Sequence, residues 1–219
     1  YLGFVPEKDT TLHRVNKYIC LEYLSGGTLY DRLSNKKLPG LKFYEQTLQI
    51  SIGILQALVY LHDFFKRDSN AQYESAIVHN DIKSPNILLD PTHTRGKLID
   101  FTHSEEWVHK NNGKHTRISL QRENISLGLD NEIQNNVSVY WTCPEKYKVG
   151  GIQSLDKSIK CDMFSLGIVF WEMITRRLPF GGVRREELAI IGYKYATGER
   201  PEIPHANSKT APASFIKTI

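Results

Sequence analysis

The chain has 219 residues, enough for one sizeable domain or two small lobes, and its 40% hydrophobic and 24% charged residues are typical of a globular protein. Its net charge of +4 comes without a long basic run, so no nucleic-acid partner is implied. No apolar run approaches the roughly 20 residues that cross a bilayer, and the three cysteines have no pattern, which suits a reducing cytoplasmic interior: Cys20, Cys143 and Cys161.

The first half of the chain predicts one strand and two helices. Tyr18–Leu24 is mostly apolar and predicts a buried strand, which two glycines, at 26 and 27, end before a short helix near Thr28–Leu33. From Phe43 to about Phe64, apolar residues recur at helical spacing over a wide stripe, which predicts a long helix. The polar stretch Lys66–Glu74 is interpreted as a surface insertion.

The second half is mostly helical in its pattern. A short strand is predicted at Lys97–Ile99, and residues 102–139 are polar without clear periodicity, as in a functional or disordered loop. Cys161–Thr175 is almost wholly apolar, which predicts a helix buried on every side, and an amphipathic helix is predicted near Arg185–Tyr195. The expected fold class is α+β and mostly α.

The segment 79–86 lies between two short apolar runs and carries an acid, an amine and an amide at fixed spacing. Transfer of a phosphoryl group requires mainly positioning and charge neutralisation from a protein. Asp81 is expected to accept or orient the attacking hydroxyl, and Lys83 to neutralise the transferring phosphoryl group. Asn86 and the later Asp100 offer the oxygen ligands that Mg²⁺ prefers.

These residues resemble the catalytic domain of the protein kinases, a resemblance that covers roughly residues 1–217. The 79–86 segment matches H-R-D-L-x-x-x-N with Asn80 in place of Arg. Further motifs follow in the family's order: D-F-G at 100–102 with Thr102 last, A-P-E at 143–145 with Cys143 first, D-x-W-S-x-G at 162–167, and G-x-R-P at 198–201. Lys83 fits the serine/threonine pattern, and Trp141 and the last motif fit the tyrosine-kinase-like group.

The resemblance implies a kinase C-lobe over 25–219, with the catalytic loop at 79–86 and the activation segment at 100–145, after an N-lobe remnant and hinge at 1–24. It also implies ATP and Mg²⁺ as cofactors, a protein substrate with serine or threonine, and a cytoplasmic location. ATP-binding roles fall on Leu21, Glu22, Leu24, Leu88 and Ile99. Structural or substrate-docking roles fall on five more residues. Ser138 is expected to meet the catalytic loop, Asp162 to accept loop amides as a helix N-cap does, and His79 to pack in the core. The other two are Phe101 and Glu145.

Departures from the family pattern set further expectations. The Gly-rich loop, the V-A-I-K lysine and its glutamate partner should precede the hinge, where the chain has only about 20 residues. We therefore expect a fragment, also truncated at the C-terminus, that transfers no measurable phosphate by itself. Asn80 removes a cation that usually receives an activation-loop phosphate, and Thr102 replaces a glycine, which predicts a stiffer magnesium loop.

Two other functions remain open on the sequence. A pseudokinase that binds partners is favoured by Asn80 and Thr102, although the residues expected to touch metal or hydroxyl are of the competent type. A small-molecule phosphotransferase of the aminoglycoside-kinase type also uses H-x-D…N followed by I-D-F, but lacks the P-E and D-x-x-S-x-G elements present in this chain. An upstream G-x-G-x-x-G turn followed by V-A-x-K would favour the kinase.

Overall fold

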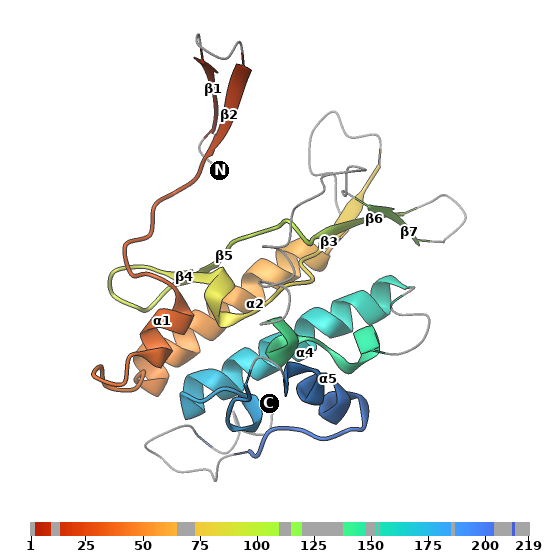
Figure 1. Cartoon of the computed structure of the whole chain (residues 1–219). Coiled ribbons are helices and arrows are strands. Elements are labelled where there is room, and N and C mark those ends of the chain that lie inside the picture. The colour runs from red at the N-terminus through yellow and green to blue at the C-terminus, as the bar shows by residue number, and fades with distance from the viewer. Residues whose placement is uncertain are drawn as a thin grey trace.

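The computed structural model describes residues 3–9, 14–64, 73–109, 115–119, 138–147, 152, 154–184, 187–203 and 212. Over these residues the fold is α+β with helices as its larger part, which confirms the expected class (Figure 1). The described strands are β1 Gly3–Asp9, β2 Arg14–Cys20, β3 Ser75–Val78, β4 Ile87–Leu89, β5 Gly96–Leu98, β6 Glu105–His109 and β7 His115–Ser119. The described α-helices are α1 Leu29–Ser34, α2 Leu48–His62, α4 Leu155–Thr175 and α5 Leu188–Ala196. A π-helical turn covers Phe43–Thr47, and short 3₁₀ turns cover Ser84–Asn86, Ser138–Trp141, Pro144–Tyr147 and Pro179–Gly181.

The strands form three small antiparallel sheets. β1 pairs with β2, so that Gly3 lies opposite Cys20, and this hairpin stands away from the helices in Figure 1. β4 pairs with β5, and β6 lies between β3 and β7. The predicted buried strand Tyr18–Leu24 is wrong in its second half, because β2 ends at Cys20 and the side chains of Leu21 and Tyr23 are 60% and 87% exposed.

The long helices build the core. On α2, Ile50, Ile54, Leu58 and Leu61 recur at three- or four-residue spacing and are buried, which confirms the predicted long helix. The buried stripe is narrower than expected, because Ile52 and Val59 are exposed. α4 confirms the predicted helix, which is mostly buried rather than buried on every side, since Met163 is exposed. It begins six residues earlier than expected, where Ser154 caps its N-terminus. α2, α4 and α5 contribute to one hydrophobic cluster, which also includes residues of α1 and β4. None of the described helices is long and apolar enough to cross a membrane.

The segment 102–139 contains structure that its sequence did not predict. β6 pairs antiparallel with β3, and Trp107 and Val108 of β6 are buried. The strand was missed because its buried pair is flanked by Glu105, Glu106 and His109, and its partner lies some thirty residues earlier in the chain. Residues 110–114 and 120–137 of this segment, and most of the predicted insertion at Lys66–Glu74, lie outside the described residues.

Two of the three cysteines are paired in the structure, although their positions in the sequence showed no pattern. Cys143 and Cys161 form a disulfide, and Cys20 is free. The two paired residues are separated by 18 positions and reach each other because the Ser138–Trp141 turn, which ends two residues before Cys143, packs against α4. Spacing along the chain carried no signal for this pair.

Candidate active site

The predicted catalytic loop, residues 79–86, is held on a buried carboxylate of α4. The backbone N–H of His79 donates to Asp162 Oδ2 at 2.9 Å, and that of Asn80 donates to Oδ1 at 2.8 Å. His62 Nε2 of α2 also lies 2.9 Å from Asp162 Oδ2. Asp162 accepts loop amides as predicted, but from inside α4 rather than near its N-cap, Ser154. A charged acceptor with two backbone donors fixes the loop more firmly than neutral contacts would.

His79 lies in the core beneath the loop. Its ring is fully buried, with Nε2 3.1 Å from the Ile99 carbonyl oxygen and the Phe101 ring 4.8 Å away. Burial lowers the pKa of His79, against the opposing effect of nearby carboxylates and the Ile99 carbonyl. The ring therefore favours its neutral form and can accept the N–H of Asp81, 3.3 Å from Nδ1.

Asn80 is one of the few non-glycine residues of the described chain with a positive φ. Its φ of 67° lies in the left-handed region, which asparagine tolerates better than arginine does. Its side-chain amide donates to the carbonyl of His103 at 3.2 Å, which links the catalytic loop to the segment after Asp100. Asn80 therefore supplies a neutral link between the two segments.

The predicted catalytic side chains lie together. Lys83 Nζ is 2.7 Å from Asp81 Oδ2 and donates to Ser138 Oγ at 2.8 Å. The Asn86 amide donates to both the backbone carbonyl and the carboxylate of Asp81, each at 2.9 Å. The Lys83 ammonium thus lies within hydrogen-bond distance of both the Asp81 carboxylate and the Ser138 hydroxyl.

Asp100 and Asn86 have the donor set for a magnesium ion. Asn86 uses its NH₂ group on Asp81, so its amide oxygen is the atom that it can offer a cation. Asp100 Oδ1 accepts from the side chain and the backbone of Thr102, at 2.5 and 3.3 Å. Burial raises the pKa of Asp100, but these hydrogen bonds and the Lys83 charge outweigh it, so the net pKa is lowered and the charged form is favoured. Two oxygen donors of these kinds fit Mg²⁺.

The residues predicted to hold adenine lie in two different environments. Leu88 of β4 and Ile99 are partly buried beside the catalytic loop, whereas Leu21 and Glu22 are exposed. Glu22 forms an ion pair with Lys97 of β5. Leu24 is of intermediate exposure. The two groups are connected through the glycines that follow Leu24.

Gly26 has a role that the sequence interpretation reduced to breaking a strand. Its N–H donates to the Leu89 carbonyl at 3.0 Å, and the N–H of Leu89 donates to the Gly27 carbonyl at 2.9 Å. A Cβ atom on Gly26 would lie 2.5 Å from the Leu89 oxygen, so only glycine allows this approach. The expected hinge is thereby attached to β4.

Lys146 is a second residue that the sequence interpretation missed. It directly follows the Pro144–Glu145 motif, and its Nζ donates to the Asn80 carbonyl at 2.8 Å. That carbonyl belongs to the peptide bond preceding Asp81. Burial lowers the pKa of Lys146, and the carboxylates of Asp162 and Asp81 oppose that effect. No local pattern could reveal this contact, because 66 positions separate the two residues.

Glu172 is a third missed residue. It is almost fully buried in α4, accepting from Ser84 Oγ at 2.9 Å and from Trp141 Nε1 at 3.0 Å. Burial raises the pKa of Glu172 to about 7, although both hydrogen bonds act in the opposite direction. The carboxyl group connects Ser84 of the predicted catalytic loop to Trp141, near the end of the predicted activation segment. The sequence signal for Glu172 was an acid within the most apolar part of the helix, ten residues after Asp162.

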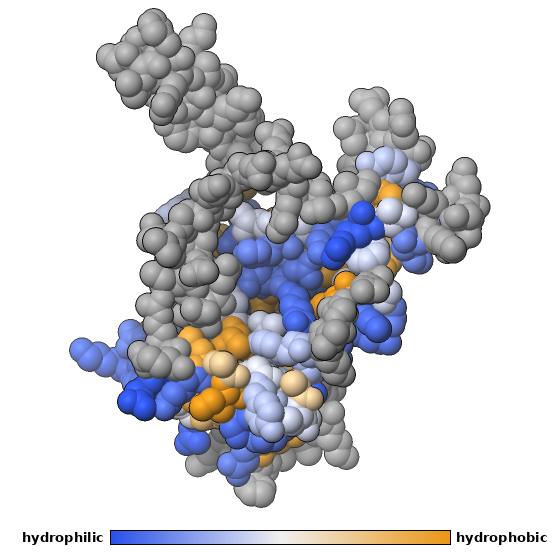
Figure 2. Space-filling model, turned by 45° about the vertical axis from the view of Figure 1, so that its right-hand side comes forward, coloured by the Kyte–Doolittle hydropathy of each residue, from blue (hydrophilic) through white to orange (hydrophobic). Residues whose placement is uncertain are grey.

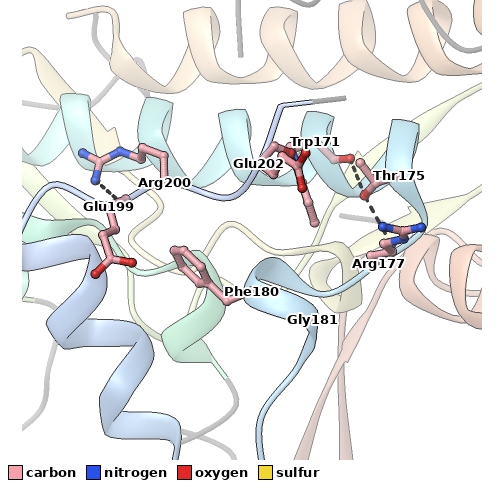
Figure 3. Close-up of a pocket in the computed structure, with 8 residues that line it drawn as sticks. All are labelled: Trp171, Thr175, Arg177, Phe180, Gly181, Glu199, Arg200 and Glu202. Atoms are coloured by element: carbon pink, nitrogen blue, oxygen red, sulfur yellow. Dashed lines mark hydrogen bonds between the residues drawn. The ribbon is translucent and has the colours of Figure 1, made fainter. Parts of the chain in front are cut away.

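The described surface also contains a pocket away from these residues. Its volume is about 570 Å³, and it lies at the C-terminal end of α4 (Figure 3). Its lining residues are Trp171, Thr175, Arg177, Phe180, Gly181, Glu199, Arg200 and Glu202. None of the predicted site residues lines it.

Figure 2 shows a largely hydrophilic face, with a group of hydrophobic residues in the lower part of the view.

A loop anchored on a helix carboxylate, with an acid, a lysine and an asparagine converging on it, is the arrangement of the protein kinase class. The sequence model of the family described as "Protein kinase domain" matches residues 5–215, so the chain belongs to that family.

Relatives with known names agree with this assignment. The chain is 32% identical over 186 residues to a probable serine/threonine-protein kinase of Dictyostelium discoideum, covering 84% of this chain and 16% of that protein. It is 33% identical over 205 residues to the mitogen-activated protein kinase kinase kinase MCK1 of Pyricularia oryzae, covering 93% and 10%. It is 30% identical over 190 residues to mitogen-activated protein kinase kinase kinase 7 of Homo sapiens, covering 84% and 25%. The chain thus spans a quarter or less of the length of these relatives.

Proposed function

We propose that this chain supplies the catalytic loop of a serine/threonine protein kinase, which transfers the γ-phosphate of ATP to a hydroxyl of a protein substrate. The observation that carries the proposal is the position of Lys83, between the Asp81 carboxylate at 2.7 Å and the Ser138 hydroxyl at 2.8 Å. An ammonium in this position neutralises charge on a transferring phosphoryl group without moving.

In the proposed reaction Asp81 orients the substrate hydroxyl and accepts its proton. Its carboxylate is held by the Asn86 amide, and the peptide bond before it is fixed at both ends. Lys146 holds the carbonyl of that peptide bond, and His79 accepts its N–H. Lys146 is thus a positioning residue, because it acts on the base through the backbone.

Asn86 and Asp100 would hold Mg²⁺, which when bound neutralises phosphate charge. Leu88 and Ile99 would lie under the adenine, with the backbone of Glu22 and Leu24 at its edge. The proposed substrate is a protein, as the names of the relatives suggest. We place the activity in the cytoplasm, which suits the kinase names of the relatives.

The test uses the full-length protein that contains this chain, with labelled ATP and peptides that carry serine, threonine or tyrosine. Asp81→Asn is expected to lower kcat at least about 100-fold, the contribution typical of a general base, and to leave the KM for ATP nearly unchanged. Asp156→Asn is the matched control, because Asp156 is an exposed acid of α4 that pairs only with Lys160 in the described residues.

Three results would contradict the proposal. Binding of ATP with no transfer by the unmodified protein would indicate a pseudokinase. Transfer only to an aminoglycoside-like small molecule would indicate the other phosphotransferase class. Equal activity of Asp81→Asn and the unmodified protein would remove Asp81 from the reaction.

A further inference from the structure

A disulfide joins the end of the activation segment to the buried helix α4. Cys143 precedes the Pro144–Tyr147 turn, and Cys161 lies next to Asp162, which holds the catalytic loop. Both cysteines are buried, with 1% and 2% of their surface exposed. Their Cα atoms are 5.2 Å apart, within the range that a disulfide spans without backbone movement.

We propose that Cys143 and Cys161 are a thiol–disulfide modification site whose oxidised form fixes the end of the activation segment on α4. In the forming reaction the two thiols exchange with a small disulfide such as glutathione disulfide. One S–S bond forms between the cysteines, the S–S bond of glutathione disulfide breaks, and the two protons pass to the two glutathione thiols released. Excess small thiol reverses the reaction.

The position of the cross-link gives it an effect on the catalytic loop. On its N-terminal side, the Trp141 carbonyl accepts from Ser165 Oγ of α4 at 2.6 Å. On its C-terminal side, Lys146 reaches the Asn80 carbonyl. Among the described residues, the disulfide is the covalent attachment to α4 that lies between these two contacts. Its loss should therefore loosen Lys146, on the C-terminal side, first. The contact with Ser165 should survive.

The surroundings of the sulfur atoms make the exchange slow. A thiol reductant must reach two buried sulfurs, so the turn has to open first. The Glu145 carboxylate lies 3.9 Å from Cys161 Sγ, and a negative charge there disfavours both a thiolate and the approach of an anionic reductant. The folded protein should therefore keep this disulfide at a reductant concentration that reduces solvent-exposed disulfides.

A metal site is the competing interpretation of the same residues. The ligand atoms of Cys143, Glu145 and Cys161 lie within 4.8 Å of one another. Thiolates and a carboxylate are ligands of zinc, which would need the two sulfurs separated rather than bonded. Bound zinc is therefore an outcome that the experiment must be able to detect.

The first experiment counts thiols in the purified chain, alkylated and unfolded without reductant. One reactive thiol per chain is expected, Cys20, against three after reduction. Cys143→Ala is the main variant, because alanine is the family's residue at this position and should fold. It is expected to expose Cys161 and give two thiols. Cys20→Ala, the matched control, should give none.

The second experiment measures the consequence of the cross-link by thermal unfolding and by amide hydrogen exchange. Reduction of the unmodified chain should lower the Tm by roughly 5–10 °C, since the disulfide closes an 18-residue separation. It should also speed exchange in residues 143–147 and at Asn80 and Asp81. Reductant should change neither quantity in Cys143→Ala, and glutathione disulfide should restore both in the unmodified chain.

Three thiols in the unreduced chain would overturn the proposal, as would one equivalent of zinc that Cys143→Ala loses. An unchanged Tm after verified reduction would overturn the fixing effect. Because no readout measures phosphate transfer, these results are independent of whether the proposed kinase activity is confirmed.

Discussion

Replacing Glu172 with glutamine should remove a pH dependence of folding stability. Glu172 is 2% exposed, and its pKa rises from 4.5 to about 7 in the folded chain. Because the folded pKa is raised, the folded state holds the proton more tightly than the unfolded state does. The contribution of this tighter proton binding to the free energy of unfolding is fully present below pH 4.5 and is lost as the pH rises through about 7.

The size of the effect follows from the rise in pKa. At about 1.4 kcal/mol per pH unit, the rise corresponds to about 3 kcal/mol of the free energy of unfolding. The Glu172→Gln variant would keep the network, since the oxygen of the new amide can accept from Trp141 Nε1 while its NH₂ group donates to the Ser84 hydroxyl. The variant retains a neutral partner at every pH.

The assay is urea unfolding followed by tryptophan fluorescence at intervals between pH 4.5 and 8. The free energy of unfolding of the unmodified chain should fall by about 3 kcal/mol relative to Glu172→Gln across this window. Glu199→Gln, at an exposed position, should keep the pH dependence of the unmodified chain. Parallel curves for the unmodified chain and Glu172→Gln would refute the assigned ionisation.

Two further predictions concern the loop's supports. Asp162→Asn removes the charge that accepts two backbone amides, and should lower the free energy of unfolding by about 3–6 kcal/mol, at roughly 1.5–3 kcal/mol for each charged hydrogen bond. A urea titration beside Asp156→Asn checks this, and equal stability of the two variants would contradict it. Lys146→Met keeps the aliphatic stem but loses the bond to the Asn80 carbonyl, so kcat in the full-length protein should fall about tenfold with an unchanged KM for ATP. Lys146→Arg should recover part of the rate, and a raised KM alone would count against positioning.

The sequence predicted well where the signal was local. The buried face of α2 follows from the spacing of its apolar residues, and the burial of most of α4 follows from its almost wholly apolar sequence. The proximity of Asp81, Lys83 and Asn86 follows from their positions in one short loop. A helix or tight loop brings its own neighbours together whatever surrounds it. Such features need no knowledge of the rest of the chain.

The predictions failed where a distant segment decides the local structure. β6 carries too many charged residues to be recognised as a strand by itself, and it forms because β3 supplies its partner. The exposure of Leu21 and Tyr23 depends on what lies over them, which their apolar character does not show. Pairing and burial are both properties of two segments.

The sequence alone therefore determined the family, and it predicted the catalytic loop and the serine/threonine pattern of Lys83, because these depend on residue types at fixed short spacings. Only the tertiary structure decided that Asp162 supports the loop from inside α4, that Lys146 holds the peptide bond before Asp81, and that Cys143 meets Cys161. Each of these contacts joins residues 18 to 83 positions apart. Packing of the chain against itself creates them, and no pattern within a single segment encodes them.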